Sequence, residues 1–197
     1  MQNYNVEEVN RLIRNRRSIY PNVFSGELVD DDHIKNMLEN ANWAPTHGIT
    51  EPWRFKVFKG EGIKRLATFQ SSLYKERSER EGVFEESKYK KLAEKPLKCS
   101  HIISIGMQRP EEEKFPEIEE VEAVACAVQN MYLTATAYGI GCYWGSGGVT
   151  YWPEAKSFFG LGEKDKLLGF LYCGMPRIEW PKGRRNSVED KVTWVTS

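Results

Sequence analysis

One long helical pattern, from about Ile118 to Tyr138, constrains the fold more than any other feature of the chain. Apolar side chains recur along it at helical spacing: Val121, Val124, Ala125, Val128, Met131, Tyr132 and Ala135. Its other faces carry further apolar residues, namely Cys126, Ala127, Leu133 and Ala137. A helix that is apolar nearly all round belongs in the centre of a protein or between subunits. We therefore expect this helix in one of those two places.

Shorter patterns on both sides of this helix predict a mixed α/β fold. Helical spacing indicates four further helices, near residues 6–16, 34–41, 63–73 and 152–159. Strand-like apolar runs occur at residues 53–57, 102–105, 142–144 and 167–173. Asn5, with Glu8 three residues later, forms a capping box that starts the first helix. The run Asp30-Asp31-Asp32 suits the N-terminus of the second helix better than a metal site.

The segment from residue 75 to 95 carries many charges of both signs and few apolar residues. Opposite charges at helical spacing are typical of a solvated surface helix. A mobile lid is the alternative, and a surface helix is the simpler interpretation. The sequence alone assigns this segment no specific role.

The overall composition limits the classes of partner. The chain of 197 residues carries 28 basic and 28 acidic side chains, which argues against a surface built for nucleic acid or an anionic membrane. No apolar run is long enough to span a membrane, and the N-terminus lacks the order of a secretory signal, so we expect a cytoplasmic protein. One domain, residues 1–197, is expected. The four cysteines form no C-x-x-C pair and are interpreted as reduced core side chains.

Several familiar chemistries are missing from the sequence. The three histidines, His33, His47 and His101, are not paired at helical spacing, so no metal site is expected. There is no G-x-S-x-G elbow and no Walker lysine loop. The glycines at 139–148 follow a helix and do not have dinucleotide-binding spacing. The absence of an acid, base or nucleophile constellation favours an enzyme in which a bound cofactor performs the chemistry.

Two segments indicate what that cofactor is. Arg16-Arg17-Ser18 places two fixed cations and a hydroxyl at the end of the first helix. Residues 44–53 form a loop punctuated by proline and glycine that ends at an aromatic residue, Trp53. Together they suggest a bound organic phosphate that carries a flat ring.

The order of the motifs resembles the FMN-dependent nitroreductase family, and in particular its small single-domain members. The resemblance covers nearly the whole chain and rests on Arg16-Arg17-Ser18, Ala44-Pro45-Thr46-His47 with Glu51-Pro52-Trp53, Ala137-Tyr138-Gly139-Ile140-Gly141, Trp144-Gly145-Ser146-Gly147, the stretch 168–176 and Arg184-Arg185. It implies an α+β sandwich with a mainly antiparallel central sheet flanked by helices. It also implies an intertwined homodimer with two FMN sites at the subunit interface.

The resemblance assigns roles to individual residues. Arg16, Arg17 and Ser18 would contact the flavin phosphate and ribityl chain, and Arg184 or Arg185 would close on the same phosphate. Other residues would approach the ring: Pro45, Thr46, His47 and Thr50, often from the partner subunit, and Gly145, Ser146 and Gly147 from the other side. His47 is then a cofactor contact, with an ordinary loop histidine as the equal alternative. Residues 135–140 correspond to a stretch associated with the nicotinamide donor, although core packing explains their spacing at least as well.

This sequence departs from the family pattern at two positions. Small relatives often carry a basic residue where this chain has Trp43 and Gly145. The lost positive charge would change the flavin potential or leave Trp43 stacked near the ring.

The implied activity is a two-step, ping-pong transfer of electrons. NADH or NADPH would reduce FMN, and a small electron-poor acceptor such as a nitroaromatic or quinone would then take two electrons, with no protein side chain as a catalytic group. Two alternatives stay open: a protein that stores or senses FMN without turnover, and a module that binds phosphate or RNA through its arginine pairs. For the phosphate- or RNA-binding module, we would expect binding affinity to fall steeply as the salt concentration rises.

Overall fold

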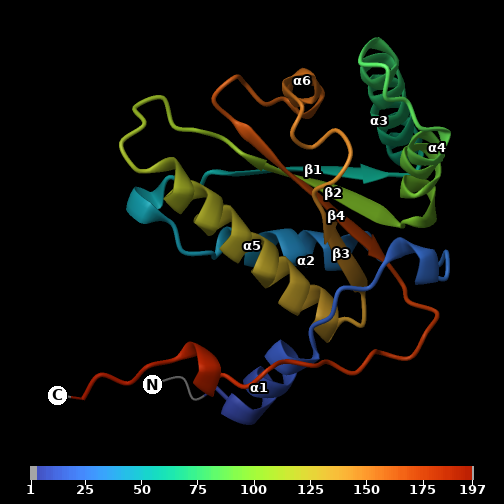
Figure 1. The fold of residues 1–197 in the computed structure, drawn as a ribbon. Helices are drawn as coiled ribbons and strands as arrows, with labels where there is room; N and C mark the ends of the chain where they lie inside the picture. Colours follow the sequence, from blue (N-terminus) through green and yellow to red (C-terminus); the bar gives the residue numbers. More distant parts are fainter. Residues whose placement is uncertain (1–3, 197) are drawn as a thin grey trace.

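A four-stranded antiparallel sheet forms the middle of the molecule in the computed structural model, which describes residues 4–196 (Figure 1). Its strands are β1 (Trp53–Lys59), β2 (His101–Met107), β3 (Gly141–Gly145) and β4 (Lys166–Gly174), in the spatial order β1-β2-β4-β3. Every neighbouring pair is antiparallel, so the expected antiparallel sheet is confirmed. Each strand is longer than the sequence predicts, by two or three residues in total.

Helices cover both faces of this sheet. They are α1 (Val6–Asn15), α2 (Asp31–Asn42), α3 (Glu61–Arg80), α4 (Glu86–Glu94), α5 (Glu117–Ala137) and α6 (Lys156–Phe159). Successive residues of β2 alternate between the two layers: Ile103 and Ile105 pack with α2 and α5, while Ile102 packs with α3 and α6. This explains the unbroken apolar run in β2, because a strand covered on both faces has no polar side.

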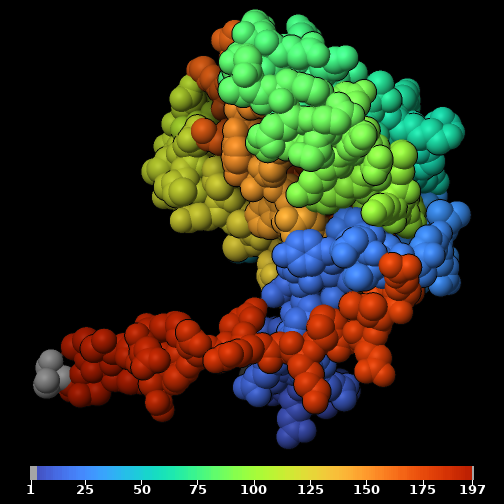
Figure 2. Space-filling view, turned by 45° about the vertical axis from the view of Figure 1, so that its right-hand side comes forward, coloured from blue at the N-terminus to red at the C-terminus, as the bar shows by residue number. Residues whose placement is uncertain are grey.

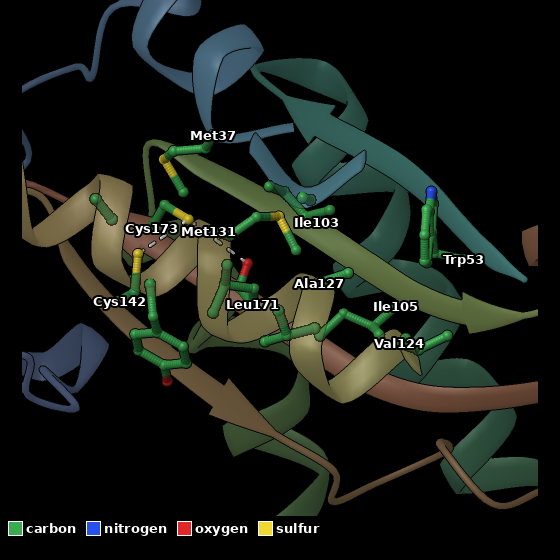
Figure 3. Packing of buried hydrophobic residues seen from close by; sticks show 14 of the residues in the cluster. Met37, Trp53, Ile103, Ile105, Val124, Ala127, Met131, Cys142, Leu171 and Cys173 are labelled. Atoms are coloured by element: carbon green, nitrogen blue, oxygen red, sulfur yellow. Dashed lines mark hydrogen bonds between the residues drawn. The ribbon is translucent and has the colours of Figure 1, made fainter. Parts of the chain in front are cut away.

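Helix α5 is the centre of the larger core cluster (Figure 3). Val124, Ala127 and Met131 are completely buried against Ile105 and Leu171 of the sheet. The opposite side of α5 is only partly covered, and Cys126 is exposed there. The prediction that all cysteines are core side chains is therefore wrong for Cys126, because this residue lies on the side of α5 that turns away from the sheet.

Local sequence signals explain where most helices begin and end. The Asn5 side chain accepts hydrogen bonds from the backbone N–H groups of Glu7 and Glu8, and Asp30 caps α2 through Asp32 N–H. The charged segment 75–95 is the end of α3 followed by α4, a pair of surface helices. The helix expected over 152–159 is shorter than predicted. A 3₁₀ turn, Pro153–Ala155, precedes α6, and Gly160 ends α6 with a φ of 76°.

Two segments lie outside this compact body. Helix α1 has no buried residue, and the chain from residue 176 to 196 runs past α1 and away from the sheet (Figures 1 and 2). The Trp180 indole N–H donates a 2.6 Å hydrogen bond to the Asn15 carbonyl and so ties the two segments together. Among residues 4–196, no helix is both long and apolar enough to span a bilayer.

Candidate functional site

The two ends of the chain meet at a cavity of about 480 Å³, and five of its eight lining residues are arginines. Its lining residues are Ile13, Arg14, Arg16, Arg17, Gln129, Gly183, Arg184 and Arg185. We call this the arginine cavity. The first arginines end α1, the last two belong to the outer C-terminal segment, and Gln129 comes from α5. The structure thus brings Arg16 and Arg17 together with Arg184 and Arg185, as the sequence analysis expected.

The charges in the arginine cavity have no acidic partners. Across residues 4–196, none of its five arginines forms an ion pair, and no carboxylate lines the cavity. Arg17 is held in place by backbone carbonyls, since its Nε donates to Pro181 at 3.0 Å and its Nη1 to Arg14 at 2.6 Å. Fixed guanidinium groups without counter-charges make a site that favours a multivalent anion such as a phosphate.

Tyr132 connects the arginine cavity to the end of β3. The Arg16 guanidinium carbon lies 5.2 Å from the centre of the Tyr132 ring, and the Ser18 side chain hydrogen-bonds to Tyr132. The Trp144 backbone N–H donates to the Tyr132 hydroxyl at 2.6 Å. Burial raises the pKa of Tyr132 to about 12, so the phenol is protonated at neutral pH. A line of polar groups therefore runs from the arginines to the Gly145-Ser146-Gly147 turn.

The Gly145-Ser146-Gly147 turn lies between two further cavities. Trp144 and Ser146 line one of about 230 Å³ on the α5 side of the sheet. Gly145 and Gly147 line another of about 280 Å³ on the α4 side, which we call the lysine cavity. A Cβ at Gly145 would come within 2.8 Å of the Tyr143 ring, so only glycine fits there without a shift. The turn thus presents backbone groups to both cavities.

The lysine cavity holds a cation that sequence reasoning missed. Lys95 lies over two aromatic rings, with its Nζ 4.6 Å from the centre of the Tyr143 ring and 4.1 Å from that of Tyr172. Burial lowers the pKa of Lys95 to about 8, and the nearby charge of Lys91 contributes in the same direction. In the sequence Lys95 is one of many lysines in a charged stretch, so nothing distinguishes it. Tyr132 was missed in the same way, as one more apolar position of a central helix.

The loop residues predicted to approach the flavin lie elsewhere in the protomer. His47 Nδ1 is 2.6 Å from Glu119 Oε2, and its ring stacks on Phe115. Thr46 and Thr50 share a hydrogen bond between their hydroxyls at 2.9 Å. Thr50 and Gly48 line a separate cavity of about 450 Å³. Three predicted residues, Trp43, Pro45 and His47, are exposed.

This loop, residues 45–50, is also strained. Ile49 has a φ of 56°, and Glu51, directly after the loop, has a φ of 44°; residues other than glycine rarely adopt such values. Such strain is concentrated in segments that bind ligands or partners. Within one protomer, however, none of the predicted residues of this loop lines the arginine cavity or the cavities at the Gly145-Ser146-Gly147 turn.

The stretch 135–140, which resembles a donor-binding segment, serves partly as core. Ala135 and Ile140 are buried in the main cluster. Only Thr136 and Ala137 reach a surface hollow, beside α1 and the outer C-terminal segment.

Comparison with known proteins agrees with this arrangement. Residues 13–175 match the Nitroreductase family. The chain is 32% identical over 166 residues to the "Putative NAD(P)H nitroreductase YdjA" of Escherichia coli (strain K12), covering 84% of this chain and 86% of that protein. It is 29% identical over 182 residues to "Putative NAD(P)H nitroreductase YfhC" of Bacillus subtilis (strain 168), covering 92% of this chain and 91% of that protein.

Solved structures show the same fold. The nitroreductase-like family protein from Bacillus cereus superposes with a TM-score of 0.79 at 28% identity, over 100% of both chains. The FMN-dependent nitroreductase NfnB from Mycobacterium smegmatis, solved in complex with NADPH, has a TM-score of 0.73 at 18% identity over 97% of this chain and 99% of that one. By sequence match, fold and the order of its motifs, this chain belongs to the nitroreductase family.

Proposed function

We propose that the protein is an FMN-dependent oxidoreductase that passes two electrons from NADH or NADPH to a small electron-poor acceptor, such as a nitroaromatic or quinone, in a ping-pong sequence. The observation that carries the proposal is the arginine cavity, in which cations from both ends of the chain converge without acidic partners. Relatives support the same assignment, since two of them carry the name "Putative NAD(P)H nitroreductase" and one solved neighbour is described as FMN-dependent. In this proposal residues 1–197 form one FMN-binding domain.

The residues present fit a flavin mononucleotide. Arg16, Arg17 and Arg184 or Arg185 would hold the phosphate, because guanidinium forks match its oxygens. Ser18 and Tyr132 lie on the way from the phosphate site to β3 and would meet the ribityl chain. Bound FMN would supply the electron transfer itself, taking a hydride equivalent from the donor and passing it to the acceptor.

The protein's part at the ring would be to orient it and to stabilise negative charge. The backbone N–H groups of Gly145, Ser146 and Gly147 are suited to this, because fixed dipoles stabilise charge without reorganising. Lys95 adds a partly desolvated cation beside the same turn. This cation compensates in part for the basic residue that relatives often carry at the position of Gly145.

We propose that the active form is a homodimer with two such sites. The outer side of α5 and the apolar side chains of α1 support this, since Val9 is 44% and Ile13 50% exposed in the protomer. A second copy would cover both and bring its own loop 45–50, with Trp43, Pro45, Thr46, His47 and Thr50, to the flavin. Free cysteines agree with a cytoplasmic location, where thiols stay reduced.

FMN retention tests the phosphate assignment. The purified protein should be yellow and release FMN on denaturation in a ratio of about one per chain. The double variant Arg16→Ala, Arg184→Ala should raise the Kd for FMN by at least about 100-fold, because two charge-assisted contacts are lost. The control is Arg65→Ala with Arg80→Ala, which removes two arginines of α3 that do not line the arginine cavity. An unchanged Kd in the first variant would refute the phosphate site.

Turnover measurements test the proposed enzymatic activity, and thiol labelling tests the proposed homodimer. Steady-state oxidation of NADH or NADPH with a nitroaromatic acceptor separates an enzyme from a protein that only stores or senses FMN. Cys126 should resist a thiol reagent in the native dimer and react after denaturation. Rapid labelling of native Cys126, together with a monomer in sedimentation, would contradict the dimer.

A further inference from the structure

The lysine cavity is lined by one side of α4 and the residue that follows it. Lys88 and Lys91 belong to α4, and Lys95 comes directly after it. Their spacings of three and four residues place all three ammonium groups on one helix face, directed at one space. Lys90, on the same helix, does not line the cavity and pairs instead with Glu86.

The cations of this face are poorly compensated. No carboxylate lines the cavity, and within residues 4–196 neither Lys91 nor Lys95 forms an ion pair. Lys88 does contact Glu85, which lies outside the lining. Like charges spaced four residues apart on a helix destabilise it, so Lys91 and Lys95 are held together at a cost that a bound anion would relieve.

The remaining walls suit a flat ring. Tyr74, Tyr143 and Tyr172 contribute aromatic surface, and Gly145 and Gly147 leave the floor open. Gln70 of α3 also lines the cavity, although only 2% of it is exposed. Within residues 4–196 the Gln70 amide makes no hydrogen bond to the rest of the chain, and it is not among the side-chain groups sealed from solvent without a partner. The amide is therefore free to bond a polar group of a ligand in this cavity.

We propose that the lysine cavity selects acceptors that carry a negative charge, namely electron-poor aromatic or quinoid rings with a carboxylate or comparable anionic substituent. Lys91, assisted by Lys88, would receive the anionic group, the tyrosines would flank the ring, and Gln70 would bond a polar substituent. This inference rests on the proposed function, because it takes the Gly145-Ser146-Gly147 turn as the place where acceptor and flavin meet.

Two acceptors of nearly equal size test the inference. For 4-nitrobenzoate, Lys91→Gln should lower kcat/KM roughly 10-fold, mainly through KM, as expected when a hydrogen bond to a charged group is lost. For neutral 4-nitrobenzamide the same variant should stay within about twofold of the native protein. Lys90→Gln is the matched control, and it should leave both acceptors unaffected. Equal changes for the two acceptors, or none for 4-nitrobenzoate, would overturn the proposal.

Binding measurements separate this inference from the proposed function. Benzoate, which cannot be reduced, should bind the native protein in calorimetry and bind Lys91→Gln roughly 10-fold more weakly. This readout needs no turnover, so it can succeed even if no acceptor is reduced and the enzyme assignment fails. The Kd for FMN should be unchanged in Lys91→Gln. If FMN binding weakens instead and benzoate binding does not, the cation serves the cofactor and the selection of anionic acceptors is refuted.

Discussion

The body of the molecule and its outer segments differ sharply in how they bury apolar side chains. The body, residues 19–175, encloses its apolar residues between the sheet and the flanking helices, and Ile105, Met131 and Leu171 are fully buried. The outer segments, α1 and residues 176–196, leave theirs in solvent. Val9 is 44% exposed, and Trp194 at the far end of the chain is 86% exposed. Figure 2 shows the C-terminal segment projecting from the body.

This contrast shows that the residues that stabilise the fold and the residues that form the proposed cofactor site lie in different parts of the chain. Burial of apolar side chains within one protomer stabilises the body. The outer segments gain little from burial within the protomer, and exposed apolar side chains on this scale indicate a binding surface. Yet these same segments, together with Arg16 and Arg17 directly after α1, provide all five arginines of the arginine cavity. The proposed cofactor site thus depends on the parts of the chain that the protomer stabilises least.

Removal of the outer C-terminal segment should have the largest effect on function. A chain ending at Arg177 lacks Arg184, Arg185 and the Trp180 bond to α1. It should keep the far-UV circular dichroism of the body but lose bound FMN and dimerise less tightly. A chain ending at Thr196 is the control. If the shortened chain binds FMN as tightly as the full chain, the outer C-terminal segment is not part of the cofactor site.

A substitution in the core should lower the stability of the fold and leave FMN affinity nearly unchanged. Met131→Ala removes a fully buried side chain of α5 and should destabilise the fold by about 2–5 kcal/mol, lowering Tm by roughly 5–15 °C. Below the transition, FMN affinity should change little, because Met131 lines none of the described cavities. Arg65→Ala, at an exposed position of α3, should leave Tm nearly unchanged. Similar Tm values for the two variants would show that α5 is not the centre of the core.

Loss of the α1 cap should have a smaller, local effect. Asn5→Ala removes the acceptor of the Glu7 and Glu8 amides and should cost about 1 kcal/mol of helix stability. Hydrogen exchange should then accelerate in the first turn of α1 and stay unchanged in β2. Asn10→Ala, in the middle of α1, should be neutral or slightly stabilising because alanine is the better helix former. Faster exchange in β2 would mean that α1 and the body unfold together.

The smallest expected effect concerns Lys95 and pH. Burial holds its folded-state pKa at about 8, below the ordinary value of 10.5, so the charged lysine destabilises the native state. This penalty is complete below pH 8 and fades as pH rises toward 10.5, where lysine loses its charge in the unfolded chain too. Lys95→Met should therefore raise Tm at pH 7. The gain in the free energy of unfolding should be less than about 1 kcal/mol, because Lys95 is only partly buried.

The pH dependence of this difference is the diagnostic measurement. The Tm advantage of Lys95→Met should shrink between pH 8 and 10.5 and vanish near the upper value. Lys98→Met, which replaces an exposed lysine outside the cavity, should show no such trend. An advantage that is constant with pH would show that Lys95 is not desolvated.

The spacing of apolar residues predicted the helices and strands well, but it predicted the residues of the candidate site only in part. The central helix, the buried strand β2 and the caps at Asn5 and Asp30 follow from local patterns, and each is present. The helix at 152–159 was predicted too long, because Pro153 and Gly160 confine it to a 3₁₀ turn and a single α turn. Lys95 and Tyr132 were missed, since their roles come from neighbours far away in sequence.

The sequence by itself determined the α/β class, the central position of α5 and the arginine motifs at both ends of the chain. These depend on the spacing of side chains along one segment, which the chain carries before it folds. Only the tertiary structure decided that the arginines share one cavity, that Lys95 is desolvated between tyrosines, and that loop 45–50 lies apart from both within one protomer. Charge without a counter-charge and partial desolvation arise from packing between distant segments, and no local pattern encodes them.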